Sequence, residues 1–538
     1  MATTPLEQGV PAAGAGNSRP AVAVAVLAFL CFAWPVYNWP GFWNTNEYSR
    51  VFLTRALVDR GSLSIDREVK AHFTQDISYF RGRFYSNKAP GISFLAALPY
   101  LGIRAVETAA GRVAAEPLLL YLLRLSTVSL PAALFLLVLN SVWRRMGAPA
   151  PLRLALLAVS AAGTPALAYS MLLYSHYPAG MLLFSSWALL ERGRAPAGAG
   201  FLAGLAVVVE YPAAVPALLL WLYSLRGGRS VRRALVFALG LGVPLAGLML
   251  YQRACFGGVF SLPYLHETHR AFFLAHNRGI VGVTYPRLET VFGLTVSPFR
   301  GLLFYAPILA AAVPGLIVLA ADPRRRADGW LFIGISLSYF YIASAFSDWE
   351  GGWSAGPRHL VPLIPFWLTA VVRLLARSRR RGAWALVLAP LGLISVIHSV
   401  SAAATFPYFP LVFSAPLYDL APALMEKGLF APSLGEAWGW RQWPGILPFV
   451  VLTGVMAGFY LGGLILWGLK SPVARSAAAV LSLVCAAVFW TGARNLATAR
   501  AAALTGAEAR AYREETARLE RFMSADQSSG APLTGPEE

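Results

Sequence analysis

Long apolar runs that recur along most of the chain constrain its fold more than any other feature. Hydrophobic residues make up 57% of the 538 residues, and charged residues make up only 13%, against about 25% in soluble domains. A helix needs about 20 apolar residues to cross a bilayer, and runs of roughly this length follow one another along the chain. The sequence therefore predicts an all-α polytopic membrane protein with about 13 transmembrane helices.

Arginine carries most of the net charge of +19, and it occurs in short clusters between the apolar runs. The positive-inside rule assigns such clusters to cytoplasmic loops, so we expect no binding to nucleic acid. The clusters expected in the cytoplasm are 144–153, 191–194, 226–233, 324–326, 377–381 and 470–475.

The expected topology follows from these clusters. Residues 1–20 are predicted to be a disordered cytoplasmic tail, and the run 21–37 an uncleaved signal anchor. The anchor delivers a first periplasmic loop, about 38–116. Within that loop the run 89–106 is slightly short and contains two prolines and an arginine. We expect it to be a re-entrant or interfacial helix, because a full crossing would put the next arginine clusters on the wrong side.

The remaining boundaries complete the predicted organisation. The transmembrane domain covers 21–492, with further outer loops at about 252–300 and 404–444. The C-terminal tail, 493–538, is predicted to be partly helical and periplasmic.

The first outer loop contains the densest polar motifs. Asn46 is expected to cap a helix that starts at Glu47, and Gly61 to end that helix. Residues 77–85 predict a β-hairpin with Arg81-Gly82 in its turn. This hairpin would aim the next polar residues at the start of the following helix, where a lysine can hold a lipid phosphate.

A second polar feature interrupts an apolar stretch at Glu210-Tyr211-Pro212. Both flanks of 198–225 are basic, so the stretch predicts two short helices whose apex faces outward. A carboxylate at mid-bilayer costs about 2.5–3.5 kcal/mol, and an apex in a wet cavity avoids most of that cost.

These motifs together resemble a known family. An outer-loop carboxylate after the first span, followed by Gly82-Arg83-Phe84-Tyr85-Ser86-Asn87-Lys88-Ala89-Pro90-Gly91, is similar to the GT-C superfamily of membrane glycosyltransferases. The branch it resembles is that of the protein O-mannosyltransferases and the bacterial lipid A aminoarabinose transferase. The 204–212 hairpin and Gly356-Pro357-Arg358, with the prolines at 362 and 365, add to the resemblance, which covers the membrane core.

Three positions depart from the pattern of that family. Asn46 precedes Glu47 where the family often has an acidic pair, and Glu210 stands where the hairpin apex often carries lysine. His176 occupies a turn in which the mannosyltransferases place an acidic residue.

The resemblance implies a GT-C-like fold and an activity. A sugar would pass from a polyprenyl-phosphate donor to a lipid, glycan or protein acceptor at the periplasmic face of a bacterial inner membrane. The high Ala, Arg and Gly content is typical of GC-rich bacterial genomes. No cofactor is expected, and no Gly-rich nucleotide-binding loop is apparent, which agrees with a lipid-linked donor.

Roles for individual residues follow from the resemblance. Glu47 is the expected base of a single inverting displacement, and its charge would stabilise an oxocarbenium-like transition state. The residues expected to bind the donor phosphate are Lys88, Arg358 and Arg300. The residues expected to bind substrate are Asn46, Arg50, Tyr85, His176, Glu210 and Tyr211.

Plainer roles stay open for the same residues. Glu47 could pair with Arg50 at the start of its helix, and Arg358 could reach the membrane interface without a ligand. His176 could make a structural hydrogen bond. No metal site is expected, because Asp348 and Glu350 have no histidine or third carboxylate close in sequence.

Two other functions are compatible with the sequence. One is a transporter or flippase of lipid-linked sugars, although no internal repeat typical of transporters is visible. The other is a non-catalytic GT-C-like scaffold of the cell envelope. Glu47→Gln separates a scaffold, which should tolerate the change, from an enzyme.

Overall fold

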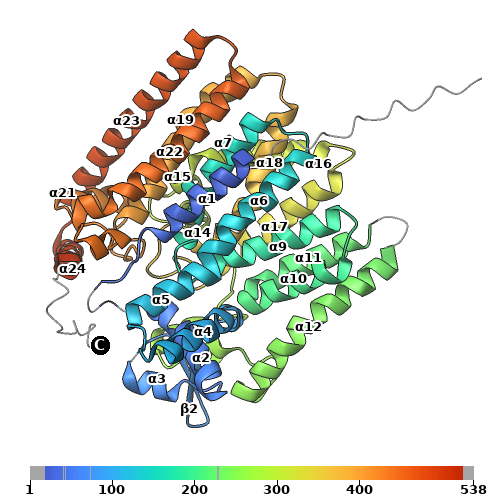
Figure 1. Cartoon of the computed structure of the whole chain (residues 1–538), viewed down its shortest axis with the longest axis vertical. Coiled ribbons are helices and arrows are strands. Elements are labelled where there is room, and N and C mark those ends of the chain that lie inside the picture. The colour runs from blue at the N-terminus through green and yellow to red at the C-terminus, as the bar shows by residue number, and fades with distance from the viewer. Residues whose placement is uncertain (1–18, 40–41, 43, 73, 227–229, 525–538) are drawn as a thin grey trace, which may run out of the picture.

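The computed structural model describes residues 19–39, 42, 44–72, 74–226 and 230–524. Most of these residues are helical, with one two-stranded sheet (Figure 1). The predicted tail 1–20, except for its last two residues, and the end of the tail 493–538 lie outside the described residues.

Seven described helices are long and apolar enough to cross a membrane, and five shorter apolar helices accompany them. This confirms an all-α membrane protein, while the number of about 13 spans and the GT-C fold stay predictions. The seven are Gly91–Ala110, Glu116–Arg145, Val231–Phe256, Arg358–Arg377, Arg381–Ala404, Gln442–Gly468 and Pro472–Ala502.

The first third of the chain begins with α1 and the compact first loop. Its elements are α1 (Arg19–Ala33), α2 (Thr45–Arg60), α3 (Asp66–Ala71), β1 (Ile77–Phe80), β2 (Arg83–Ser86) and α4 (Gly91–Ala110). The predicted hairpin is confirmed: Arg81 and Gly82 have φ values of 49° and 83°, as a two-residue turn of the mirror-image type requires. The predicted helix end at Gly61 is also confirmed, with a φ of 60°.

The predicted cap of α2 is wrong by two residues. Asn44, not Asn46, caps the helix, and its side-chain oxygen accepts from the Glu47 N–H at 3.1 Å. Asn44 has the extended backbone of a capping residue, three positions before the amide that it binds. Asn46 already lies in the first helical turn, and its side chain accepts a hydrogen bond from Arg50.

The next helices form the centre of the bundle. They are α5 (Glu116–Arg124), the π-turn η1 (Leu125–Ser129), α6 (Leu130–Arg145), α7 (Ala150–Ala162), α8 (Ala166–Tyr169) and α9 (His176–Glu191). The apolar run 152–173 is broken at Gly163-Thr164-Pro165, because proline cannot donate the backbone hydrogen bond of a helix interior.

The predicted pair of short helices around Glu210 is confirmed. The elements are α10 (Pro196–Val209), η2 (Tyr211–Ala213) and α11 (Ala214–Ser224), followed by α12 (Ser230–Phe256). A Cβ on Gly200 would lie 1.9 Å from the Phe237 carbonyl oxygen. Glycine therefore lets α10 and α12 approach backbone to backbone, as small residues do in membrane helix pairs.

The remaining elements alternate long helices with outer-loop segments. They are η3 (Pro263–His266), α13 (Arg270–His276), α14 (Leu288–Thr295), α15 (Leu302–Tyr305), η4 (Pro307–Ala311), α16 (Ala312–Ala321), α17 (Arg326–Ala345), η5 (Arg358–Leu363), α18 (Ile364–Arg377), α19 (Arg381–Ala404), α20 (Pro416–Asp419), α21 (Ala421–Glu426), η6 (Leu434–Trp438), α22 (Gln442–Gly468), α23 (Pro472–Ala502) and α24 (Gly506–Ser524).

The bundle has a basic end and an end that carries the first loop. At the basic end Glu191 lies 3.3 Å from Arg145 and 3.0 Å from Arg325, so three of the predicted cytoplasmic clusters meet there. At the other end α2, α3, α4 and the hairpin lie together beside the long helices (Figure 1). The predicted topology, including which end faces the cytoplasm, stays a prediction.

The C-terminal helix α24 lies at the same end as the first loop. Phe522 stacks on Trp39 with ring centroids 6.0 Å apart and meets Phe42 edge to face at 4.8 Å. The described part of the tail is mostly helical, and Phe522 packs it on the segment that precedes α2.

Candidate functional site

Glu47 lies at the centre of a buried cluster, and its side chain is 0% exposed. Its Oε1 accepts from Arg124 Nε at 2.7 Å and from the Leu173 N–H at 2.6 Å. Its Oε2 accepts from Arg124 Nη2 at 2.6 Å and from the Tyr408 hydroxyl at 2.8 Å. A carboxylate has about four lone-pair positions, so the donors from three distant segments occupy all the acceptor positions of the Glu47 carboxylate.

This geometry favours a structural role for Glu47. A general base needs a free lone pair within reach of the proton that it removes, whereas each oxygen here already accepts two hydrogen bonds. Glu47 joins α2 to α5, to the turn before α9 and to the loop after α19. Its role as the base stays a prediction.

Arg124 is the residue that sequence reasoning missed. It lies in the apolar run of the second span, and its side chain is buried. An ionisable residue inside an apolar span is by default a functional or structural site with a partner of opposite charge. That rule would have singled out Arg124, although it could not have named Glu47 as its partner.

Lys88 is held at the start of α4 by an aspartate. Its Nζ lies 3.0 Å from Asp76 Oδ1, and its side chain is 13% exposed. Asp76 also accepts from Thr45 Oγ1 at 3.0 Å, which ties the lysine to the first turn of α2. Burial lowers the pKa of Lys88; Asp76 opposes this shift, and the nearby Arg50 and Arg358 cations add to it.

The side chain of Arg358 packs against a turn that contains Gly351. Gly351 has a φ of 72°, and a Cβ at this position would lie 2.7 Å from Arg358 Nε. Glycine is therefore required both for the backbone conformation and for room. The Arg358 side chain is 14% exposed, and its Nη2 is 3.9 Å from Asp348 Oδ2, too far for a hydrogen bond.

Three further predicted residues meet close to these cations. Arg50 donates to the Asn46 carbonyl at 2.6 Å and to Ser175 Oγ at 3.4 Å, so Asn46 positions it. His176 Nδ1 lies 3.1 Å from Glu210 Oε2, but without the angles of a hydrogen bond. The bend between α10 and α11 thus reaches the first turn of α9.

Several buried polar atoms in this region have no hydrogen-bond partner within the described ranges. They are Arg50 Nε, His176 Nδ1, Glu210 Oε2, Arg358 Nε and His359 Nε2. The rings of His176 and His359 lie 5.5 Å apart. An unsatisfied buried polar group costs about 1–3 kcal/mol, so such a concentration indicates a place where a ligand or water binds.

We refer to Arg50, Lys88, His176, Glu210, Asp348, Arg358 and His359 as the outer polar cluster. These residues come from α2, the start of α4, the start of α9, the α10–α11 bend and the segment between α17 and α18. Five of them were predicted from the sequence, and the fold brings those five into one region. Asp348 and His359 join them only through the fold.

The other predicted site residues make different contacts. Arg300 is fully buried and donates to four carbonyl oxygens, those of Phe299, Glu350, Gly352 and Phe409. It holds two outer segments together, and this use of its donors disfavours a phosphate ligand. Tyr85 packs edge to face on Phe256, with centroids 5.3 Å apart. Tyr211 packs on Tyr264 at 5.7 Å, beside the cluster.

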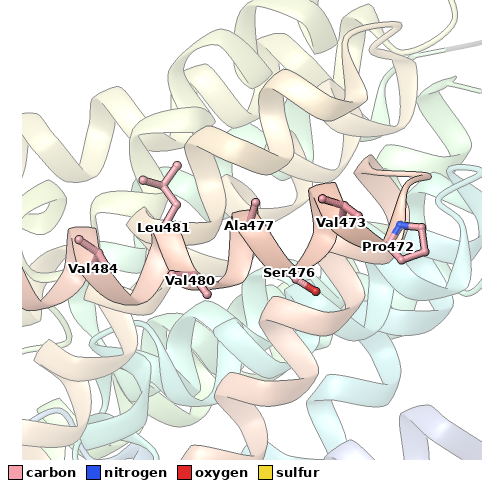
Figure 2. A pocket seen from close by; sticks show the side chains of 7 residues that line it. All are labelled: Pro472, Val473, Ser476, Ala477, Val480, Leu481 and Val484. Atoms are coloured by element: carbon pink, nitrogen blue, oxygen red, sulfur yellow. The ribbon is translucent and has the colours of Figure 1, made fainter.

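The described chain offers no group of side chains suited to a metal ion, and the hollow along α23 is not a candidate functional site. No group of three or more His, Cys, Asp or Glu side chains in it is arranged to hold a metal ion. A hollow of about 720 Å³ lies along α23 (Figure 2), lined by Pro472, Val473, Ser476, Ala477, Val480, Leu481 and Val484. These residues all come from one helix face, and nearly all are apolar, as expected of a surface in contact with lipid tails.

Comparisons with known proteins give no family assignment. No protein-family model matches the chain, and no curated protein sequence matches it significantly. The function of the chain is therefore inferred from the geometry of the outer polar cluster and from the motifs of the first loop.

Proposed function

We propose that this chain is a GT-C-like membrane glycosyltransferase that takes a sugar from a polyprenyl-phosphate donor. The observation that carries this proposal is the pair of largely buried cations Lys88 and Arg358. They come from different segments, and Arg358 Nε has no protein partner in the described ranges. A phosphate that leaves a sugar gains negative charge in the transition state, and fixed cations stabilise that charge.

The position of Lys88 suits a donor that is embedded in lipid. Lys88 lies three residues before α4, a helix with an exposed apolar face formed by Leu95, Leu98 and Leu101. An isoprenoid chain lying in the outer leaflet along such a face would bring its phosphate to the membrane surface at the start of α4. The proposal therefore places the reaction at the periplasmic face of a bacterial inner membrane, with the N-terminus in the cytoplasm.

The acceptor in this proposal is a hydroxyl group of a lipid, glycan or protein. The cluster also supplies hydrogen-bonding groups for a sugar, because His176, Glu210 and His359 each have a free polar atom in the described structure. No step in the proposal requires a cofactor or a nucleotide.

A transfer assay tests the proposal. Purified protein in detergent would be incubated with radiolabelled polyprenyl-phosphate sugars and a membrane-lipid extract. Arg358→Gln is the sharpest variant, because the nearest carboxylate to its guanidinium in the described part of the chain, that of Asp348, is 3.9 Å away, so little folding energy is lost with the charge. Loss of a charge-assisted contact of about 1.5–3 kcal/mol predicts transfer reduced by roughly 10- to 150-fold.

Arg83→Gln is the matched control, since Arg83 is exposed on the β-hairpin of the same loop. It should transfer label like the unaltered protein. Binding of donor without transfer by the unaltered protein would favour the transporter or flippase. An absence of both binding and transfer with all donors would favour the scaffold.

A further inference from the structure

Asp348 is the more exposed of the two carboxylates of the outer polar cluster, and it is also more exposed than Asp76, which holds Lys88. Its side chain is 24% exposed, compared with 9% for Asp76 and 6% for Glu210. Among the described residues no hydrogen bond to its carboxylate is formed, and the nearest cation, Arg358, stays at 3.9 Å. A substrate hydroxyl can therefore reach the carboxylate of Asp348, and this carboxylate can accept a proton without the loss of an existing hydrogen bond.

Three neighbouring carboxylates, those of Asp76, Glu267 and Glu47, already accept hydrogen bonds. Asp76 accepts from Lys88, from Thr45 and from Asn87. Glu267 accepts from Asn87 at 2.8 Å and lies 2.6 Å from His276 Nδ1. With Glu47 filled by four donors, these carboxylates fix the shape of the site, and an incoming hydroxyl would have to displace a donor to reach any of them.

The backbone around Asp348 is held in place on both sides. Ser347 N donates to the Gly282 carbonyl at 2.9 Å, and Gly351 N donates to the Asp348 carbonyl at 3.0 Å. The same turn packs against the Arg358 side chain through Gly351. A carboxylate on a rigid turn next to an unsatisfied cation is preorganised for work on a substrate.

We propose that Asp348 is the catalytic base of the transfer reaction. This inference rests on the proposed function and replaces Glu47 in that role. Asp348 takes the proton of the acceptor hydroxyl as the acceptor oxygen bonds to the anomeric carbon. The bond from that carbon to the phosphate oxygen breaks, and its electron pair leaves with the polyprenyl phosphate, whose charge faces Lys88 and Arg358. Asp348 then releases the proton to water.

The electrostatics of the turn agree with this assignment. Burial raises the pKa of Asp348 above its ordinary value, and Arg358, His276 and Lys88 oppose that rise without cancelling it. A raised pKa makes a carboxylate a better proton acceptor near neutral pH.

The test compares Asp348→Asn with Glu350→Gln, a carboxylate in the same loop whose cationic neighbours are Arg300 and Arg287. Removal of a general base typically lowers the rate about 10²- to 10⁴-fold. We expect that loss in Asp348→Asn, with donor binding within about threefold of the unaltered protein. Glu350→Gln should transfer at close to the normal rate.

Azide distinguishes a base from a residue that only holds the site together. Azide is an anionic nucleophile that needs no deprotonation, so it should restore release of phosphate in Asp348→Asn and form a glycosyl azide. Asp348→Glu, which keeps the carboxylate, should retain more activity than Asp348→Asn. If Asp348→Asn binds donor poorly, the activity of Asp348→Glu still shows whether a carboxylate is needed at this position.

The outcomes separate the two proposals. Normal transfer by Asp348→Asn, or equal losses in Asp348→Asn and Asp348→Glu without azide rescue, would overturn the role of Asp348 and leave the glycosyltransferase standing. Failure of the unaltered protein to transfer from any donor would overturn both.

Discussion

The ion pair of Glu47 and Arg124 provides the sharpest test of how this site is built. Glu47→Gln keeps the shape of the side chain and removes its charge. The amide nitrogen cannot accept a hydrogen bond, so two of the four donors to Glu47 lose their acceptor. Arg124 loses one of its two bonds to residue 47 in either orientation of the amide, and it keeps the Val36 carbonyl at 2.7 Å, the Tyr408 hydroxyl at 3.2 Å and a longer contact to the Tyr37 carbonyl.

The expected cost is large because the pair is buried. Removal of one partner of a buried ion pair typically costs about 3–5 kcal/mol, since the other charge stays behind without compensation. At about 1.4 kcal/mol per factor of ten, the folding equilibrium would shift by roughly two to four powers of ten. Arg124→Met should cost a similar amount. The double variant should cost less than the sum of the two, because it leaves no lone charge.

Buried cysteines make the measurement direct. Cys31 and Cys255 are buried, so a thiol-reactive fluorophore added to protein in detergent reports unfolding as they become exposed. We expect a clearly lower unfolding temperature for Glu47→Gln and partial recovery in the double variant. A normal unfolding temperature together with abolished transfer would refute this reasoning and restore Glu47 as the base.

Three further predictions concern the residues around Arg358. Gly351→Ala should weaken donor binding at least about tenfold and destabilise the protein by about 1–3 kcal/mol. The added Cβ is strained at a positive φ and collides with the Arg358 side chain. Donor binding is measured by a scintillation assay and stability by thermal unfolding. Arg300→Gln should lower the unfolding temperature, because four carbonyl groups lose a charged donor, yet the folded fraction should bind donor with normal affinity. Transfer should fall as pH drops through the raised pKa of Asp348, since only the ionised carboxylate accepts a proton; a rate–pH profile should place this fall at higher pH than for an exposed aspartate.

Local residue patterns determined much of the architecture without the fold. The hairpin turn at Arg81-Gly82, the helix end at Gly61 and the bend at Glu210 were all predictable. Each depends on backbone preferences of one or two residues or on a short interruption of an apolar run. The membrane class follows in the same way from the length and spacing of apolar runs.

The chemistry of the site depended on the tertiary structure. Glu47 and Arg124 are 77 positions apart, and no periodicity relates them; the packing of α2 against α5 alone makes them partners. The same packing places four donors on the carboxylate of Glu47, which makes Glu47 a poor base, and surrounds Arg300 with carbonyl groups. It leaves the carboxylate of Asp348 without a hydrogen bond among the described residues. Residue type and local spacing tell which groups can ionise, but free lone pairs and unused donors are decided by contacts between segments far apart in the chain.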